Sequence, residues 1–219
     1  MSEPHTGCNL IVLLSGNGSN LQAIIDRIET GQLQASIVGV ISDKTDAYGL
    51  QRATKHHIPH SVVTPAAGET RAAYDERLQT AIETYQADWI IMAGFMRILS
   101  DTLVTSYPGR LINIHPSLLP EYKGLNTHQR VLDAGELVHG ASVHFVTPAL
   151  DDGPVIMAEQ IPVQPDETAE QLKQRVHQVE YQIYPEVIAL LCQQRITYLD
   201  GHIYLDGKII NVPLNAETQ

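Results

Sequence analysis

The fold is decided by the stretch Leu10-Ile-Val-Leu-Leu-Ser-Gly-Asn-Gly-Ser-Asn20. Residues 10–14 form a continuous apolar run that is partly β-branched, as expected of a strand buried on both faces. Gly16 and Gly18 permit a tight turn, and apolar residues then recur at helical spacing over 21–28. A strand, a glycine-rich turn and a helix in this order predict the first unit of an α/β fold.

Short apolar runs continue to alternate with helical patterns along the first half of the chain. Strands are predicted at 37–41, 61–63, 88–92 and 111–115, and helices at 47–56 and 69–85. This alternation indicates right-handed βαβ crossovers and a mostly parallel, Rossmann-like twisted sheet with helices on both faces. Because ligands bind beyond the carboxyl ends of such strands, the loops after 14, 92 and 115 are expected to form one site.

The second half of the chain adds strands at 140–147 and from 155, then a long helix from Thr168 to about Leu191. Pro185 is expected to kink or split that helix. The two Asp-Gly pairs near the end predict a C-terminal hairpin, and residues after Pro213 are expected to be loose. We therefore expect a single domain over 8–195, with halves 8–100 and 101–195, followed by a hairpin and tail at 196–219.

The turn at 16–20 is also a candidate anion site. Ser19 or Asn20 can cap the helix that follows, and its free N–H groups and dipole then point into the turn. The turn matches neither the GxGxxG nor the Walker pattern, so one phosphate of a phosphosugar fits better than a nucleoside triphosphate. A purely structural glycine turn is the alternative.

Polar residues alternate at the end of the strand 111–115. Asn113 and His115 project to the same side, offering an amide donor and an imidazole to a carbonyl oxygen that becomes negative. The alternative is two ordinary polar residues satisfied by nearby backbone. Asp151 lies in a turn that is expected to pack beside them, where a carboxylate would favour the imidazolium. An Asp-Asp-Gly-Pro sequence is otherwise an ordinary turn.

Composition limits the function classes. The chain has 219 residues, 43% of them hydrophobic, and a net charge of −11, which argues against general nucleic-acid or membrane binding. Cys8 and Cys192 have no metal-ligand spacing and make no disulfide framework, so reduced thiols are expected. No signal peptide follows Met1, and no apolar run is long enough to span a bilayer. We expect a soluble, cytoplasmic protein.

Five motifs, in order along the chain, resemble the phosphoribosylglycinamide formyltransferase family of purine synthesis, and the resemblance extends from Ile11 to about Leu191. The motifs are Ser-Gly-Asn-Gly-Ser-Asn-Leu-Gln (15–22), Ala-Gly-Phe-Met-Arg-Ile-Leu (93–99), Asn-Ile-His-Pro-Ser-Leu-Leu-Pro (113–120), His-Gly-Ala-Ser-Val-His-Phe-Val (139–146) and Leu-Asp-Asp-Gly-Pro (150–154). The first is more specific because it suits a sugar phosphate, and the middle three occur in the wider formyltransferase superfamily. The sequence departs from the family pattern at 121–126 and at Tyr181.

The resemblance implies formyl transfer from 10-formyltetrahydrofolate, as a cosubstrate and without a metal, to the amine of 5-phosphoribosylglycinamide. It implies the catalytic residues Asn113, His115 and Asp151, in a chain that is a monomer or a weak homodimer. Residues 8–100 would form the phosphoribosyl-binding half, and 101–195 the catalytic and folate-binding half. The ribonucleotide would bind Gly16, Asn17, Gly18, Ser19, Asn20 and Glu180. The folate would bind Arg71, Met96, Arg97, Ile98, Leu99, Asn113, Thr147, Pro148, Ala149, Leu150 and Asp151.

Three rival functions are open. A formyltetrahydrofolate hydrolase would use water in place of the amine, but it usually carries an additional N-terminal domain and lacks the 16–20 turn. A methionyl-tRNA formyltransferase would need a further basic domain, which an acidic chain of this length cannot supply. A catalytically silent binding module would not need Asn113, His115 and Asp151 together. The hydrolase is the main alternative.

Overall fold

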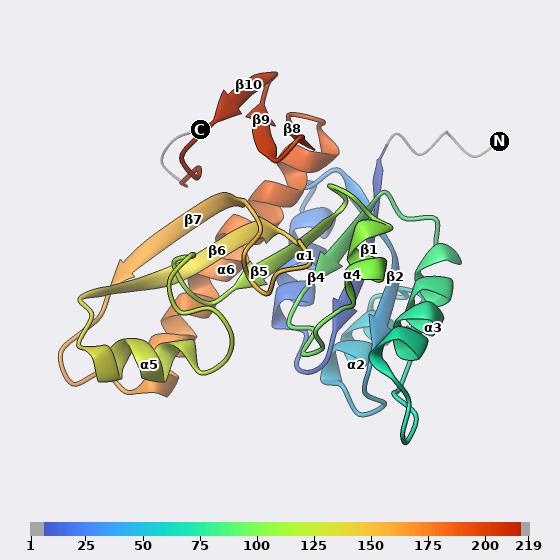
Figure 1. Cartoon of the computed structure of the whole chain (residues 1–219), viewed down its shortest axis with the longest axis horizontal. Coiled ribbons are helices and arrows are strands. Elements are labelled where there is room, and N and C mark those ends of the chain that lie inside the picture. Colours follow the sequence, from blue (N-terminus) through green and yellow to red (C-terminus); the bar gives the residue numbers. More distant parts are fainter. Residues whose placement is uncertain (1–6, 216–219) are drawn as a thin grey trace.

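The computed structural model describes residues 7–215 and is built around a seven-stranded sheet in the order β3-β2-β1-β4-β5-β6-β7 (Figure 1). Strands β1 to β5 are all parallel to one another. Strand β6 pairs antiparallel with β5 on one side and with β7 on the other. The predicted mostly parallel α/β sheet is thus confirmed. The strands are β1 (Cys8–Leu14), β2 (Ala35–Ser42), β3 (His60–Val62), β4 (Trp89–Met92), β5 (Leu111–His115), β6 (Val138–Phe145) and β7 (Val155–Pro162).

Helices cover both faces of the sheet. One hydrophobic core packs α1, α2 and α6 against it, and a second packs α3 and α4 against the opposite face. The helix α4 has only five residues and was not predicted, because so short a segment shows no helical period. The helices are α1 (Ser19–Glu29), α2 (Tyr48–Lys55), α3 (Arg71–Glu83), α4 (Asp101–Thr105), α5 (Thr127–Ala134) and α6 (Ala169–Cys192).

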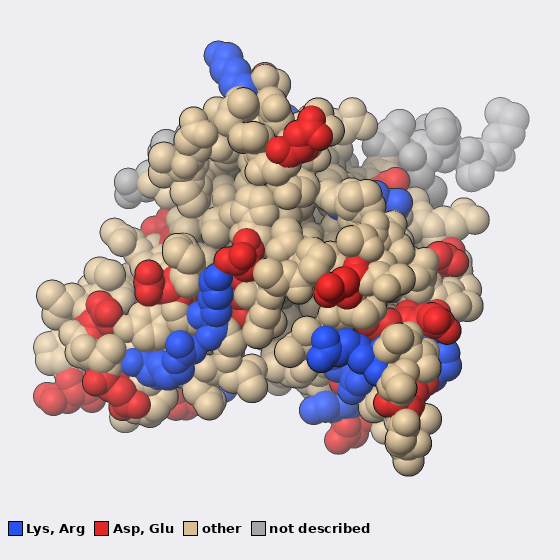
Figure 2. All heavy atoms as spheres, viewed as in Figure 1, with Lys and Arg blue, Asp and Glu red and all other residues tan. Residues whose placement is uncertain are grey.

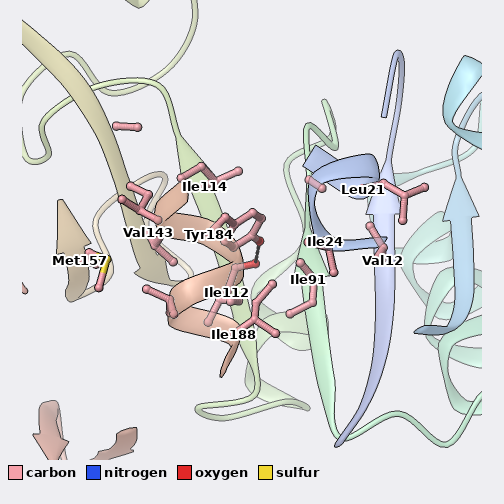
Figure 3. Packing of buried hydrophobic residues seen from close by; sticks show 14 of the residues in the cluster. Val12, Leu21, Ile24, Ile91, Ile112, Ile114, Val143, Met157, Tyr184 and Ile188 are labelled. Carbon is pink, nitrogen blue, oxygen red and sulfur yellow. Dashed lines mark hydrogen bonds between the residues drawn. The ribbon is translucent and has the colours of Figure 1, made fainter. Parts of the chain in front are cut away.

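Helix α6 is continuous through Pro185, so the proline does not split it. It begins with a capping box, in which the Thr168 side chain accepts from the Gln171 amide and the Gln171 side chain accepts from the Thr168 amide. The hydroxyl of the fully buried Tyr184 donates to the carbonyl oxygens of Met92 (2.8 Å) and Ile112 (3.3 Å). Helix α6 is thereby tied to the last residue of β4 and to the second residue of β5 within the core (Figure 3).

The C-terminal region forms a separate antiparallel sheet of three strands, β8 (Ile196–Leu199), β9 (His202–Leu205) and β10 (Lys208–Ile210). The predicted hairpin is present, with one more strand than a hairpin has. The expectation that the chain is loose after Pro213 is wrong for Leu214, which hydrogen-bonds to Ile156 and Ala158 beside β7. Residues 216–219, the rest of the predicted tail, lie outside the described part of the chain.

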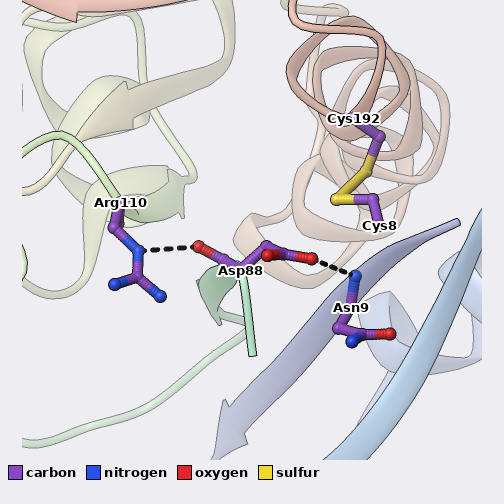
Figure 4. Close-up of a disulfide and its surroundings, with 5 residues drawn as sticks. All are labelled: Cys8, Asn9, Asp88, Arg110 and Cys192. Atoms are coloured by element: carbon purple, nitrogen blue, oxygen red, sulfur yellow. Dashed lines mark hydrogen bonds between the residues drawn. A yellow bond between two sulfur atoms is a disulfide. The ribbon is translucent and has the colours of Figure 1, made fainter. Parts of the chain in front are cut away.

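The expectation of two reduced cysteines is wrong, because the structure joins Cys8 and Cys192 in a disulfide (Figure 4). Cys8 begins β1 and Cys192 ends α6, and their Cα atoms lie 5.2 Å apart although 184 positions separate them in sequence. The packing of α6 against the sheet brings these two ends together, and sequence spacing alone does not reveal such a meeting.

Charged side chains of both signs are intermixed on the molecular face shown in Figure 2. Among the helices of the described residues, none is both long and apolar enough to cross a membrane. The expectation that no signal peptide follows Met1 falls largely on residues 1–6, which lie outside the described part of the chain.

Candidate active site

His115, at the end of β5, has a partner on each ring nitrogen. Its Nε2 lies 3.1 Å from the Tyr122 carbonyl oxygen, and its Nδ1 lies 3.5 Å from Asp151 Oδ2. Because a carbonyl oxygen only accepts, Nε2 carries a proton in both the neutral and the charged ring. Nδ1 is therefore the nitrogen that faces the Asp151 carboxylate. The structure thus brings Asp151 beside His115.

Asn113 is oriented by His144, which sequence reasoning did not select. The two residues are opposite each other in the antiparallel register of β5 and β6, and Asn113 Nδ2 lies 3.2 Å from His144 Nε2. Burial lowers the pKa of His144, so the ring is neutral; its Nδ1–H donates to the Phe145 carbonyl oxygen at 2.9 Å. Nε2 is then an acceptor, which fixes one Asn113 N–H on His144 and leaves the other free to donate.

One cavity gathers most of the predicted folate residues around Asn113 and Asp151. It is also lined by Arg97, Ile98, Leu99 and the loop 147–150, with Met92, Val104, His144 and Val146 completing its wall. Two predicted residues are not in this lining. Met96 is 62% exposed, and Arg71, the first residue of α3, is also exposed.

The glycine-rich turn opens on the same edge of the sheet. The Ser15 amide donates to the Gly94 carbonyl oxygen (3.0 Å), and Ser15 Oγ accepts from the Met96 amide (2.8 Å), so this turn and the loop after β4 are joined. The expectation that Ser19 or Asn20 caps α1 is wrong, because Gly18 is the N-cap residue and no side chain makes the capping bond. The N-terminal N–H groups of α1 therefore meet no capping side chain.

Arg52 of α2 holds the turn from outside, another role that sequence reasoning missed. Its Nε donates to the Asn17 carbonyl oxygen (2.9 Å) and its Nη2 to Asn17 Oδ1 (3.0 Å). Its Nη1 donates to Gln22 Oε1 (3.1 Å), and its guanidinium lies over the Tyr48 ring. Arginine side chains are suited to such multiple bonds because their donors form a planar fork. The turn is thus fixed to α2 as well as to β1.

Gly18 cannot accept a side chain without movement of the backbone. Its φ is +71°, and a Cβ would lie 2.6 Å from the Gly49 Cα atom. Gly18→Ala is therefore expected to lower the free energy of unfolding by about 2–4 kcal/mol, from left-handed strain plus overpacking. Gly16→Ala is the matched control, because its Cβ would meet nothing within 4 Å. Urea unfolding of both variants checks this; equal losses would contradict it.

The side chain of Glu180, in α6, contacts the N-terminal end of α1. Its Oε2 accepts from Asn20 Nδ2 at 2.8 Å, and both side chains are buried. Burial raises the pKa of Glu180 to about 7, against the smaller lowering effect of the Asn20 bond. Within residues 7–215, Asn20 Oδ1 is buried without a hydrogen-bond partner.

Comparison with known proteins gives relatives over nearly the whole chain. The sequence profile of the formyl transferase family matches residues 8–188. A protein named phosphoribosylglycinamide formyltransferase from Escherichia coli is 46% identical over 200 residues, which cover 91% of this chain and 94% of that protein. Its namesake from Haemophilus influenzae is 40% identical over 201 residues, covering 92% of this chain and 95% of that protein.

Solved structures agree with these relatives. A phosphoribosylglycinamide formyltransferase from Coxiella burnetii in complex with CHES superposes with a TM-score of 0.91 at 46% identity, covering 95% of this chain and 99% of that chain. A formyltetrahydrofolate deformylase from Pseudomonas syringae has a TM-score of 0.84 at 24% identity, covering 91% of this chain and 66% of that chain. The second likeness is one of fold alone.

Proposed function

The chain belongs to the formyl transferase family, and we propose that it transfers the formyl group of 10-formyltetrahydrofolate to the amine of 5-phosphoribosylglycinamide, a step of purine synthesis. The observation that carries this proposal is that Asn113 and Asp151 line one cavity with the 97–99 and 147–150 segments, and that Asp151 lies 3.5 Å from His115 behind them. Relatives named for this reaction, at 40–46% identity over nearly their whole length, support it.

The reaction replaces one carbon–nitrogen bond by another. The glycinamide amine attacks the formyl carbon, and the carbonyl oxygen becomes an oxyanion that accepts from the free Asn113 N–H and from His115 Nδ1–H. The bond to the folate nitrogen then breaks, and the proton on Nδ1 goes to that nitrogen. Asp151 stabilises the imidazolium and orients a water that takes the proton lost by the amine.

The two substrates are assigned to neighbouring parts of the sheet edge. The ribonucleotide phosphate is placed on the 16–20 turn, where the first N–H groups of α1 and its dipole favour an anion. The ribose hydroxyls are placed on Glu180, and the folate on 96–99 and 147–151, with Arg71 toward its glutamate. Residues 8–100 carry the phosphate turn and are taken as the ribonucleotide half, and 101–195 as the catalytic and folate half, with Arg71 and 96–99 reaching the folate from the first half and Glu180 reaching the ribose from the second.

A direct assay separates transferase from hydrolase. The purified chain is mixed with a 10-formylfolate, with and without the ribonucleotide, and absorbance of the deformylated folate is followed. We expect deformylation only when the ribonucleotide is present, because the amine and not water is the nucleophile. Equal rates in its absence would overturn the proposal in favour of the hydrolase.

The proposed cytoplasmic location and small-molecule partners rest on the family alone. The Cys8–Cys192 disulfide removes the argument from reduced thiols. A monomer or a weak homodimer is proposed on the same ground.

A further inference from the structure

The segment Tyr122–Asn126 contacts both ionisable groups of the site through its main chain. The Tyr122 carbonyl oxygen accepts from His115 Nε2 (3.1 Å), and the Gly124 amide donates to Asp151 Oδ2 (2.9 Å). One short piece of backbone therefore sets which His115 nitrogen faces the substrates and where the Asp151 carboxylate sits. This is also the segment in which the sequence departs from the pattern of the family.

The backbone of this segment is in conformations that need external support. Tyr122, Gly124 and Asn126 have φ values of +54°, +80° and +57°. The left-handed region is costly for residues other than glycine, by about 1–2 kcal/mol each, and such residues keep it only where their surroundings hold them. Contacts outside the site must therefore fix the segment.

Arg130 of α5 supplies such a contact on each side of Gly124. Its Nη1 donates to the Lys123 carbonyl oxygen (2.7 Å) and, more weakly, to the Leu125 carbonyl oxygen (3.4 Å). Its guanidinium also lies over the Tyr122 ring, 5.4 Å from the centroid. The side chain thus binds the main chain beside the Tyr122 carbonyl group and the Gly124 amide, which contact His115 and Asp151. Arg130 itself is exposed and touches neither of these two catalytic residues.

Two other contacts hold the segment more peripherally. The Tyr122 hydroxyl donates to Glu136 Oε1 at 2.8 Å, and Lys123 forms an ion pair with Asp152. Both bind side chains of the segment. Arg130 binds carbonyl groups of its backbone: the Lys123 carbonyl shares a peptide plane with the Gly124 amide, and the Tyr122 carbonyl oxygen belongs to the peptide just before it.

We propose that Arg130 is a positioning residue for formyl transfer, acting through the 122–125 backbone to keep His115 in the Nε2–H form and Asp151 against it. The proposal rests on the proposed function for its kinetic consequence, but not for its structural one. Loss of the Arg130 bonds lets the Tyr122 carbonyl oxygen move away, and the proton of neutral His115 then exchanges between Nε2 and Nδ1. The proposed reaction needs Nδ1 to take up a proton and give it to the folate nitrogen, whereas a neutral ring already protonated at Nδ1 gains its second proton on Nε2, away from the substrates.

The test compares Arg130→Gln with Arg110→Gln. Arg110 is a matched control, because it is also exposed, donates from Nε to the Asp88 carbonyl oxygen (2.9 Å) and lies over the Tyr107 ring, but beside the opposite end of β5 (Figure 4). The first readout is the ¹⁵N chemical shifts of the His115 ring in the protein without substrates, which separate the two tautomers. The second is kcat and KM for both substrates.

For Arg130→Gln we expect a mixture of tautomers at His115 and a kcat about 10- to 100-fold lower, as for a misplacement of about 1 Å, with both KM values little changed. Arg110→Gln should change neither readout, and Arg130→Lys, which keeps one charged donor, should fall between wild type and Arg130→Gln. If Arg130→Gln does not fold, Arg130→Lys decides alone.

A pure Nε2–H ring and a wild-type kcat in Arg130→Gln would overturn the inference, as would equal losses in the two arginine variants. A wild-type chain that transfers no formyl group would instead overturn the proposed function, and the tautomer readout would still decide whether Arg130 positions His115.

Discussion

Replacing Asn113 by alanine is expected to lower kcat by about 10²- to 10³-fold, the usual cost of one oxyanion donor. The structure gives the physical reason. His144 fixes one Asn113 N–H at 3.2 Å, so the amide is oriented before substrate arrives, and its other N–H faces the cavity without having to reorganise. An interaction that forms fully only with the charged oxygen lowers the barrier and leaves substrate binding nearly unchanged.

Steady-state kinetics with both substrates checks this prediction. Asn9→Ala serves as a control, because Asn9 also lies on a strand of the sheet but near the start of β1, at the other end from the site (Figure 4). The control should keep the wild-type kcat. A loss in Asn113→Ala that resided in KM alone would assign the residue to ground-state binding and remove it from oxyanion stabilisation.

Glu180 should make the stability of the protein fall as the pH rises from about 4.5 to about 7. Burial raises the pKa of Glu180 from 4.5 to about 7, so within this window the unfolded chain releases a proton that the folded chain keeps. The folded state therefore loses stability across the window, by about 3 kcal/mol in total, and the loss is complete above pH 7. Glu180→Gln has no such proton and keeps an oxygen for Asn20.

Urea unfolding at several pH values measures the effect. Glu180→Gln should match wild type near pH 4.5 and exceed its free energy of unfolding by about 3 kcal/mol at pH 8. Glu186→Gln is the comparison on the same helix; burial also raises the pKa of Glu186, but its side chain is only partly buried, so its gain should be smaller. A difference between Glu180→Gln and wild type that did not vary with pH would refute the prediction.

Glu180→Gln should also bind the ribonucleotide more weakly, because the proposed ribose ligand has lost its charge.

Much of this arrangement could be predicted because it depends on local pattern. The apolar run 10–14 followed by glycines indicated a buried strand and a turn, and the two-residue period of a strand placed Asn113 and His115 on one side. Asp151 was expected beside this pair because its turn closes a neighbouring pair of strands, although β6 runs antiparallel to β5 and the turn leaves beside Ile112, so that the loop runs back toward His115. The observed His115–Asp151 distance of 3.5 Å agrees with that expectation.

The remaining features depend on register and on long-range packing. His144 alternates correctly along β6, but only the pairing of β5 with β6 shows that it lies opposite Asn113. The Cys8–Cys192 bond and the pairing of Leu214 with β7 join segments that are remote in sequence and carry no local signal of meeting. The Tyr122 and Gly124 contacts are made by main-chain atoms, which every sequence contains, so residue identity could not single them out.

The buried hydroxyl oxygen of Tyr184 has a wider consequence. Through the Tyr184 hydroxyl, the helix that bears Glu180 is hydrogen-bonded to the end of β4, just before the 93–99 loop, and to Ile112, the residue that precedes Asn113 in β5. The proposed ribose ligand Glu180 and the cavity at Asn113 are thus connected through one helix and one hydroxyl group. We therefore expect this scaffold to set the distance between the two proposed substrate sites before either substrate binds.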